Sequence, residues 1–368
     1  MAPSNEHSRR GFLKNAAVAG AASLATGTAN ADPVYNRRLK IGAIGVGEYS
    51  FTTFSWSDII EPDKPANNPR NSTMDTSFLN MDFTHCWDVN PEAAQKFAAR
   101  MDGTAVKRYD EMVGKVDGII FGGLYEAPWQ CRLAHPYVEA GIPVYLSRPF
   151  AYRLRDLDDL LDLAAEKGTP IMATAKYEHY KEAPALKAKL AKLGQIRCVH
   201  ATCNTPDYPV HFHLQFMMMR ILGYDVDTVS VQTDDLMRNN YLQTDWIYKG
   251  WENQHPFPLS MQGLRNSDQF TISIFGSNHT ETASMLRSPD WQDGLYFRYA
   301  PQILAMQRTF EGNQLEPLEN IRKKTAIFLA GLKSFYENNG GPVKVDSVSP
   351  DWTAPFPMPG WIDDSIFR

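Results

Sequence analysis

The sequence lacks the features of several large classes of protein. It has no long run of lysine or arginine, and its formal net charge is −5, so nucleic-acid binding is not expected. It has no unbroken apolar stretch of the roughly 20 residues that would span a bilayer. Its only four cysteines, Cys86, Cys131, Cys198 and Cys203, match no zinc or disulfide spacing. The composition, 43 % hydrophobic and 21 % charged residues, is typical of a globular protein. The length of 368 residues suits two domains.

The N-terminus has the order of segments found in an export signal. Ser8–Lys14 reads SRRGFLK, a twin-arginine motif, and an apolar, alanine-rich stretch follows it. That stretch ends in Ala29-Asn30-Ala31, a small-x-small cleavage site. We therefore expect residues 1–31 to be a signal peptide and the mature chain, beginning near Asp32, to reach the periplasm already folded. The alternative is an ordinary basic tail.

The rest of the chain changes its pattern once. Residues 39–175 alternate between apolar strands and helical segments, which predicts a doubly wound parallel sheet of the Rossmann type. After about residue 190 the strands are longer and alternate more regularly, which predicts a second α/β domain with an open mixed or antiparallel sheet. We expect a dinucleotide-binding domain over 32–155. A substrate-binding and oligomerisation domain should occupy 156–368 and end in a Pro- and Trp-rich arm.

A glycine turn follows the first strand. Residues 45–50, GVGEYS, match G-x-G-x-x-G except at the last position. The first glycine would form the tight turn, and the second would let a pyrophosphate approach the backbone at a helix N-terminus. Asp88 ends the second strand, where an acid can accept hydrogen bonds from ribose hydroxyls and repel a 2′-phosphate. This favours NAD over NADP. The alternative is a turn without a ligand and an Asp88 that caps the helix near Pro91.

The chain resembles the glucose-fructose oxidoreductase, inositol dehydrogenase and rhizopine catabolism (Gfo/Idh/MocA) family, especially its exported members. The resemblance is carried by IGAIGVG, CWDVNPEAAQKFA, RYDEMVGKVDGIIFGG, HPYVEAGIPVYLSRPFAYRLRDLDDLLDLAAEKGTPIM and FHLQFMMMRILG. It implies a Rossmann domain and a second domain whose open sheet often forms the subunit interface. It also implies hydride transfer between NAD(P) and a carbon of a sugar or cyclitol. Some members are hydrolases that use bound NAD, and some have lost redox chemistry.

Three positions depart from the family's pattern. The family's Glu-Lys-Pro is Ser147-Arg148-Pro149 here, and Gln130 stands where a histidine would fall. The family's Asp-x-x-x-His motif aligns its histidine with His213, which puts Pro209 at the acid. A shifted alignment gives Asp207-x-x-x-His211 instead. Both histidines therefore remain candidates.

The resemblance implies a catalytic role for this region. In the family the lysine hydrogen-bonds the reacting hydroxyl and the histidine is the general acid/base. Arg148 can hold an oxygen or a carboxylate but cannot exchange its proton near pH 7, so proton transfer would fall to His213 or His211. The alternative for Arg148 is a salt bridge at the domain junction.

Two further sets of residues are candidates for the same region. If HFH is extended, His211 and His213 share one face and could bind a metal with Glu178 and His179, although one catalytic and one lining histidine is the favoured interpretation. The expected substrate contacts are Lys176, Tyr177, Tyr208 and Trp129. The expected cofactor-binding residues are Gly45, Gly47, Glu48, Tyr49, Ser50, Asp88, Gly122, Arg148 and Pro149.

Three functions are therefore open. The first is an exported NAD(P)-dependent oxidoreductase of a sugar or sugar derivative, forming a homo-oligomer through its C-terminal sheet. The second is a carbohydrate hydrolase or lyase that uses bound NAD or a metal at His211 and His213. The third is a non-catalytic sugar-binding relative.

Overall fold

The computed structural model describes most of the chain after the expected signal peptide. The described residues are 37–47, 50–62, 64, 79–123, 126–237, 239–251, 254–265, 270–284, 291–355 and 364–367. The predicted signal peptide lies outside them, as do two predicted cofactor-binding residues, Glu48 and Tyr49. None of the described helices is long and apolar enough to cross a membrane.

The first sheet has six parallel strands in the order β3-β2-β1-β4-β5-β6. Its strands are β1 Leu39–Ile44, β2 Met81–Trp87, β3 Thr104–Ala105, β4 Gly118–Phe121, β5 Val144–Leu146 and β6 Ile171–Ala173. Because both faces of such a sheet are covered, the strands are apolar throughout rather than alternating; all four residues of β4 are buried. The predicted Rossmann-type sheet is confirmed. It continues to β6, beyond the boundary at residue 155 that we expected from the sequence.

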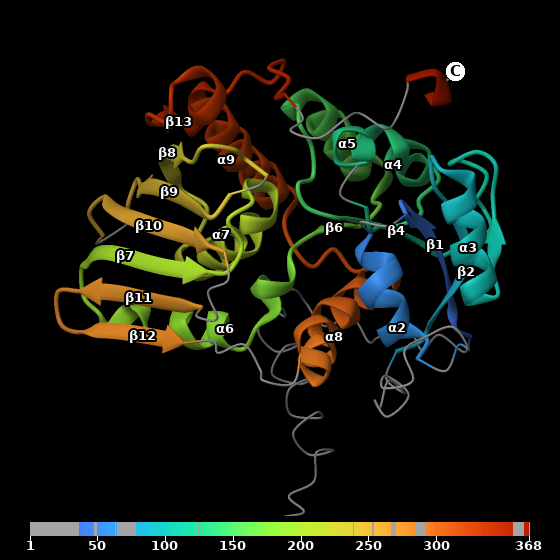
Figure 1. Cartoon of the computed structure of the whole chain (residues 1–368), viewed down its shortest axis with the longest axis horizontal. Helices are drawn as coiled ribbons and strands as arrows, with labels where there is room; N and C mark the ends of the chain where they lie inside the picture. The colour runs from blue at the N-terminus through green and yellow to red at the C-terminus, as the bar shows by residue number, and fades with distance from the viewer. Residues whose placement is uncertain are drawn as a thin grey trace, which may run out of the picture.

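Helices cover both faces of this sheet (Figure 1). They are η1 Thr52–Trp56, α2 Ser57–Ile60, α3 Pro91–Met101, α4 Gln130–Glu139, α5 Leu154–Lys167 and α8 Trp291–Phe310. Helix α8 comes from far along the chain, yet Ile303, Met306 and Phe310 share one core with Leu39 and Ile41 of β1. The first domain is therefore completed by a segment from the C-terminal part of the sequence.

The second sheet has seven strands in the order β12-β11-β7-β10-β9-β8-β13. They are β7 Ile196–Cys203, β8 Val226–Gln232, β9 Tyr241–Tyr248, β10 Phe257–Leu264, β11 Thr271–Gly276, β12 Thr280–Ser284 and β13 Val343–Lys344. β7 and β10 pair in parallel, whereas β10 and β9 pair antiparallel, so the sheet is mixed as predicted. Helices α7 Tyr208–Leu222 and α9 Leu318–Glu337 lie between the two sheets (Figure 1).

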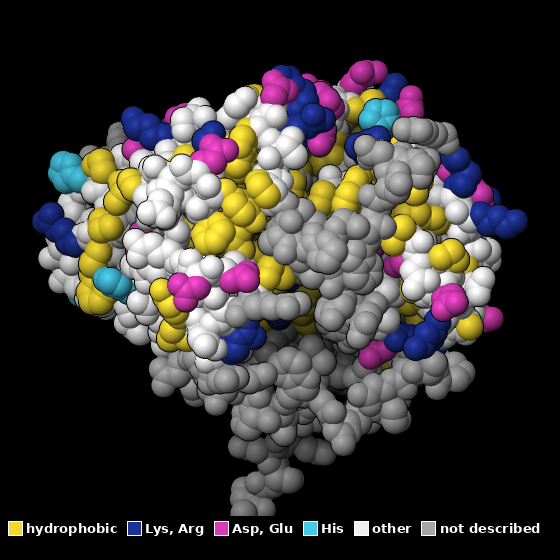
Figure 2. All heavy atoms as spheres, turned by 45° about the horizontal axis from the view of Figure 1, so that its top comes forward, with side chains coloured by type: hydrophobic (Ala, Val, Ile, Leu, Met, Phe, Trp, Pro, Cys, Tyr) yellow, Lys and Arg dark blue, Asp and Glu magenta, His cyan; other side chains and the backbone are white. Residues whose placement is uncertain are grey.

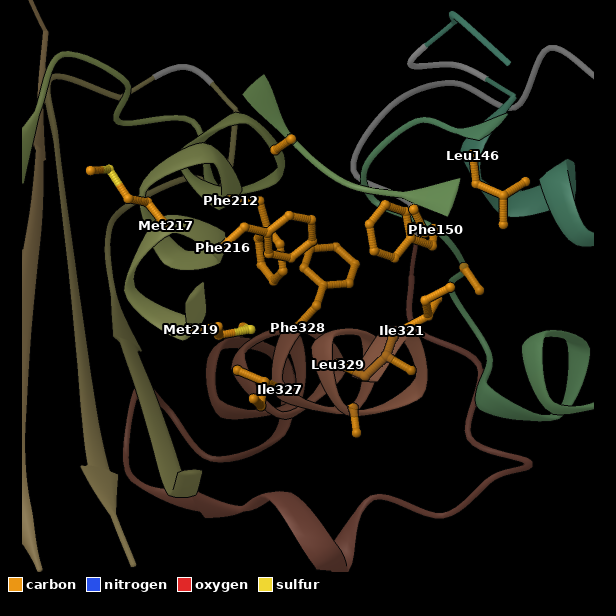
Figure 3. Close-up of a cluster of buried hydrophobic side chains, with 14 of the residues drawn as sticks. Leu146, Phe150, Phe212, Phe216, Met217, Met219, Ile321, Ile327, Phe328 and Leu329 are labelled. Carbon is orange, nitrogen blue, oxygen red and sulfur yellow. The ribbon is translucent and has the colours of Figure 1, made fainter. Parts of the chain in front are cut away.

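An aromatic cluster joins the two domains at this junction (Figure 3). Phe150, which follows the Ser147-Arg148-Pro149 turn, packs against Phe216 of α7 with ring centroids 5.1 Å apart. Phe212 of α7 packs edge-on against Phe328 of α9 at 4.6 Å. Because aromatic pairs stabilise beyond the area they bury, this cluster fixes α7 and α9 relative to the end of β5.

A buried lysine makes a second connection between the domains. Lys324 of α9 is fully buried, and its Nζ donates to the Ala173 carbonyl of β6 at 3.1 Å. The same Nζ contacts Glu178 at 2.7 Å and Glu316 at 2.8 Å. Burial lowers the pKa of Lys324, but the two carboxylates outweigh it, so the pKa lies above its usual value. Burial raises the pKa of Glu178 to about 7.

We expect Lys324→Met to destabilise the protein by about 3 kcal/mol or more, since removing one partner of a buried ion pair leaves the others uncompensated. The loss should be larger at pH 8 than at pH 5.5, where Glu178 can take up a proton. Lys323→Met is the matched control, because Lys323 forms half-exposed pairs with Asp225 and Glu319, and such pairs contribute roughly 0–1 kcal/mol. Denaturant unfolding measures both. Equal effects of the two substitutions would contradict this account.

Candidate functional site

The glycine turn lies at the end of β1 and against Asp88. Gly45 has φ +73°, a conformation that favours glycine. The Val46 N–H donates to Oδ2 of Asp88 at 2.8 Å, and a Cβ at Gly47 would lie 3.3 Å from the same oxygen. Burial raises the pKa of Asp88. The structure thus brings Asp88 and the two glycines together, and the residue that caps α3 is Asn90 rather than Asp88.

The segment after the turn packs onto the end of β4. Hydroxyl groups tie it back to the turn: Ser50 donates to the Gly45 carbonyl, and Thr53 donates to the Val46 carbonyl at 2.5 Å. The Phe51 N–H donates to the Gly122 carbonyl at 2.9 Å. A Cβ at Gly122 would lie 1.8 Å from Oγ1 of Thr52, so only glycine fits there. Gly122 therefore permits the close approach that seats Phe51 in the site.

The Ser147-Arg148-Pro149 turn is held by Gln130, at the start of α4. The Ser147 N–H donates to the side-chain oxygen of Gln130 at 2.9 Å. The amide nitrogen of Gln130 donates to the carbonyls of Ser147 and Pro149, both at 3.0 Å. The Arg148–Pro149 peptide bond is cis. Gln130 is thus a positioning residue for Arg148, and the sequence indicated it only as a departure from the family's histidine.

Arg148 is a buried cation that has no carboxylate partner among the residues that the structure describes. Its side chain is almost fully buried, with the guanidinium 4.1 Å from the centre of the Phe51 ring. Nη1 contacts the Ser147 hydroxyl at 3.2 Å, whereas Nε and Nη2 have no hydrogen-bond partner. Within the described part of the chain no carboxylate forms a salt bridge with it, so the alternative of a salt bridge at the junction is not supported there. Because buried donors need partners, these nitrogens are suited to an oxygen-rich ligand.

His213 also lies beside Phe51. Its ring is 6.4 Å from that of Phe51 and 5.0 Å from that of Tyr177. It is buried, and its Nδ1 has no hydrogen-bond partner. Burial lowers the pKa of His213 well below its usual value, and the positive charges of Arg148 and Lys176 lower it further. The structure therefore brings Arg148 and His213 into one compartment, with a histidine that is neutral near pH 7.

Lys176 and Tyr299 complete this compartment. Nζ of Lys176 lies 3.2 Å from the Tyr299 hydroxyl, and Tyr299 comes from α8. The Tyr299 ring lies 6.3 Å from that of Phe51. We call the set formed by Phe51, Arg148, Lys176, Tyr177, His213 and Tyr299 the cationic cluster. Two cations, a neutral imidazole and a hydroxyl group within one buried region can hold a substrate oxygen and move a proton.

The remaining predicted residues lie elsewhere. Tyr208 is in the core, where its hydroxyl donates to the Phe328 carbonyl at 3.1 Å. Trp129 is half-buried at the end of the 3-10 helix η3 Ala127–Trp129. His211 is buried, contacts Gln215 at 3.3 Å, and has a pKa lowered to about 3 by burial.

The condition for a shared metal face at HFH is not met, because the segment is helical rather than extended. His211 and His213 lie inside α7, and side chains two positions apart in a helix point in directions about 200° apart around its axis. His213 lies in the second turn of α7. Glu178 is bound to Lys324, and His179 contacts Thr174 at 3.0 Å. Among the described residues no group of three or more His, Cys, Asp or Glu is arranged to hold a metal ion.

Several solved structures of dehydrogenases, inositol dehydrogenases among them, are similar to this chain in fold. A scyllo-inositol dehydrogenase from Lactobacillus casei has a TM-score of 0.65 at 12 % identity over 85 % of this chain and all of its own. GenD2 from gentamicin A biosynthesis, solved with NAD, has a TM-score of 0.63 at 13 % identity, over 86 % of this chain and 99 % of its own. The WlbA dehydrogenase from Bordetella pertussis, solved with NADH and UDP-GlcNAcA, has a TM-score of 0.62 at 14 % identity, over 85 % of this chain and 99 % of its own. No family model and no curated protein sequence matches this chain. These likenesses show that the chain has the two-domain α/β fold of such dehydrogenases.

We expect Arg148→Met to raise the pKa of His213, because the substitution removes a nearby positive charge while keeping the compartment apolar. Arg153→Met is the control, since Arg153 pairs with Asp156 at the surface. Titration of the histidine ring signals by NMR measures the effect. An unchanged His213 titration in Arg148→Met would show that the two side chains do not share a compartment.

Proposed function

We propose that this protein is an NAD-dependent oxidoreductase that transfers hydride to or from a hydroxyl-bearing carbon of a sugar or sugar derivative. The observation that carries the proposal is that Arg148 and His213 both contact the ring of Phe51, whose backbone is hydrogen-bonded to the end of β4. That arrangement puts cationic and proton-transferring groups beside the glycine turn. The similarity in fold to GenD2, solved with NAD, and to the WlbA dehydrogenase, solved with NADH and UDP-GlcNAcA, supports it.

The residues around the turn fit a dinucleotide. Gly45 and Gly47 form the turn at the end of β1, with the carboxyl group of Glu126 above Gly45. Asp88 lies beside Gly47, where it could accept hydrogen bonds from ribose hydroxyls. Buried polar atoms without partners, including Oγ1 of Thr52 and Nε of Arg148, lie in the same region. When bound, NAD would supply the hydride acceptor at the strand ends. Asp88 would favour NAD over NADP, because a carboxylate repels the 2′-phosphate.

The cationic cluster would manage the proton and the charge on oxygen. His213, which is neutral near pH 7 because its pKa is lowered, would accept the proton of the substrate hydroxyl. Hydride would leave the carbon that bears this hydroxyl. Arg148 would hold that oxygen and stabilise the negative charge that develops on it. Lys176, which contacts Tyr299, would supply a second positive charge. Because Arg148 keeps its proton near pH 7, it orients the substrate and His213 moves the proton.

Titration with NAD and NADP, followed by assays of NADH absorbance with sugars and cyclitols, tests the proposal. We expect tighter binding of NAD and net formation of NADH with an oxidisable substrate. NAD binding without any net redox change, together with cleavage of a glycoside, would favour the hydrolase or lyase reading. Sugar binding without binding of either dinucleotide would favour the non-catalytic reading. Tighter binding of NADP would place Asp88 away from the ribose.

We expect His213→Ala to lower turnover by roughly 10²–10⁴-fold, the usual contribution of a general acid/base, while NAD affinity changes little. His211→Ala is the matched control, because His211 lies on another side of α7 and contacts Gln215. Steady-state kinetics and calorimetric binding of NAD measure both variants. If His211→Ala caused the larger loss of turnover, the assignment of the base would be contradicted.

Export by the twin-arginine route is the second part of the proposal. It is supported by Arg9 and Arg10 within SRRGFLK and by the Ala29-Asn30-Ala31 cleavage site. Replacing both arginines by lysine should keep the protein in the cytoplasm, as cell fractionation would show. The mature N-terminus should lie at or near Asp32. Unchanged export of the double variant would refute this part.

The outer face of the seven-stranded sheet is proposed to form a homo-oligomer. Tyr241 and Ile247 of β9, Leu264 of β10 and Phe275 of β11 are each more than a third exposed. Hydrophobic side chains gather on the side of the molecule where this sheet lies (Figure 2). Such exposed apolar surface is typical of an interface. Analytical ultracentrifugation of the unchanged protein and of Ile247→Lys tests this. An oligomer of the unchanged protein that dissociates in Ile247→Lys would support the proposal. If both proteins sedimented as monomers, the proposal would be contradicted.

A further inference from the structure

Glu126 occupies the space above two glycines at the ends of β1 and β4. A Cβ built on Gly45 would lie 2.6 Å from Oε2 of Glu126, and one built on Gly123 would lie 1.6 Å from it. Glu126 is 5 % exposed, and within the described part of the chain its Oε2 has no hydrogen-bond partner. Any side chain larger than hydrogen at either position would displace this carboxyl group. The two glycines therefore leave room for it.

This location is the ligand crevice of the first sheet. In the order β3-β2-β1-β4-β5-β6 the winding reverses between β1 and β4, and open α/β sheets bind ligands outside the carboxyl ends of the strands at this point. Gly45 belongs to the glycine turn and Gly123 follows β4, so the Glu126 carboxyl group stands between them. A buried polar group without a partner, placed in a ligand crevice, indicates a group that awaits a ligand.

The charge state of Glu126 decides what it can do there. Burial, and then the negative charge of Asp88, raise the pKa of Glu126 to about 8. Asp88, from the end of β2, is the charged group that acts on it. A neutral carboxylic acid can donate a hydrogen bond to a phosphate oxygen. An ionised one beside Asp88 would repel the negative charge of a pyrophosphate, and a low-dielectric site strengthens that repulsion.

We propose that Glu126 is a proton-dependent ligand of the dinucleotide: its protonated side chain donates to the pyrophosphate, and its ionised side chain excludes it. This inference rests on the proposed function, because it names how the same crevice admits its cofactor. It makes dinucleotide affinity fall as the pH rises, and it links cofactor binding to the binding of a proton at Glu126.

Calorimetric binding of NAD to the full chain between pH 6 and pH 9 tests the inference. If only the protonated form binds, affinity at pH 9 should be about tenfold weaker than at pH 6, since that pH is about one unit above the pKa of about 8. Glu126→Gln should bind with little dependence on pH and about tenfold more tightly than the unchanged protein at pH 9. Glu139→Gln, at the exposed end of α4, is the matched control and should behave as the unchanged protein does.

The outcomes separate this inference from the proposed function. NAD binding that is independent of pH, or that falls equally with pH in Glu126→Gln, overturns the inference and leaves the function standing. Failure of the unchanged protein and of Glu126→Gln to bind NAD at any pH overturns both. Thermal unfolding at pH 9 checks the fold without cofactor: Glu126→Gln should be at least as stable as the unchanged protein, because it removes a buried charge. If Glu126→Gln does not fold, Glu126→Ala replaces it in the same titration. Loss of the pH dependence of NAD affinity would then support the inference, and an unchanged pH dependence would overturn it.

Discussion

The contact of Lys324 with the end of β6 is the interaction on which the site depends. One buried Nζ joins the last strand of the first sheet to Glu178 and Glu316. Glu178 also accepts from the Ala175 N–H at 2.8 Å, so its carboxylate fixes the backbone on both sides of Lys176 and Tyr177. A buried cation in this position is costly unless every partner is present. It therefore specifies one arrangement of the two domains, the arrangement in which these side chains face α7.

The cationic cluster is organised around an aromatic ring rather than around an ion pair. Phe51 receives the guanidinium of Arg148 on its face, and cation–π contact compensates part of the cost of burying that charge. The same ring borders His213 and Tyr299. Burial lowers the pKa of His213, and the positive charge of Arg148, which no carboxylate of the described residues neutralises, lowers it further. A neutral base beside a fixed cation is the combination that oxidation of an alcohol requires.

The sequence predicted the regular parts of this structure and missed parts that depend on contacts between distant segments. Alternation of apolar strands and helices was enough for the six-stranded sheet. The glycine spacing located the turn, and the end of the second strand located Asp88. The sequence left the conformation of the HFH segment open, because its helix is buried nearly all round and its apolar residues show no period that distinguishes a helix from a strand. Tyr208 was predicted to contact the substrate because of its position in the sequence. Its hydroxyl instead donates to the backbone carbonyl of Phe328, 120 residues away.

Phe51, Tyr299 and Glu126 had no signal of their own in the sequence. Phe51 reaches the site because Gly122 lets the preceding backbone approach β4. Tyr299 lies on α8, which returns to the first domain after six of the seven strands of the second sheet. In the sequence Glu126 is an ordinary acidic residue before a short helix. Its buried position against two glycines is seen only in the folded structure. In each case packing in three dimensions, rather than local pattern, determines the role.

The central claim is that the crevice between β1 and β4 binds NAD beside a cluster that oxidises an alcohol. The most direct measurement is the structure of the full chain soaked with NAD, with its bound species also identified by native mass spectrometry. The account predicts NAD in that crevice, with the nicotinamide between Arg148 and His213 and the adenine ribose at Asp88. A chain that takes up no dinucleotide, or holds it away from the cationic cluster, would contradict it.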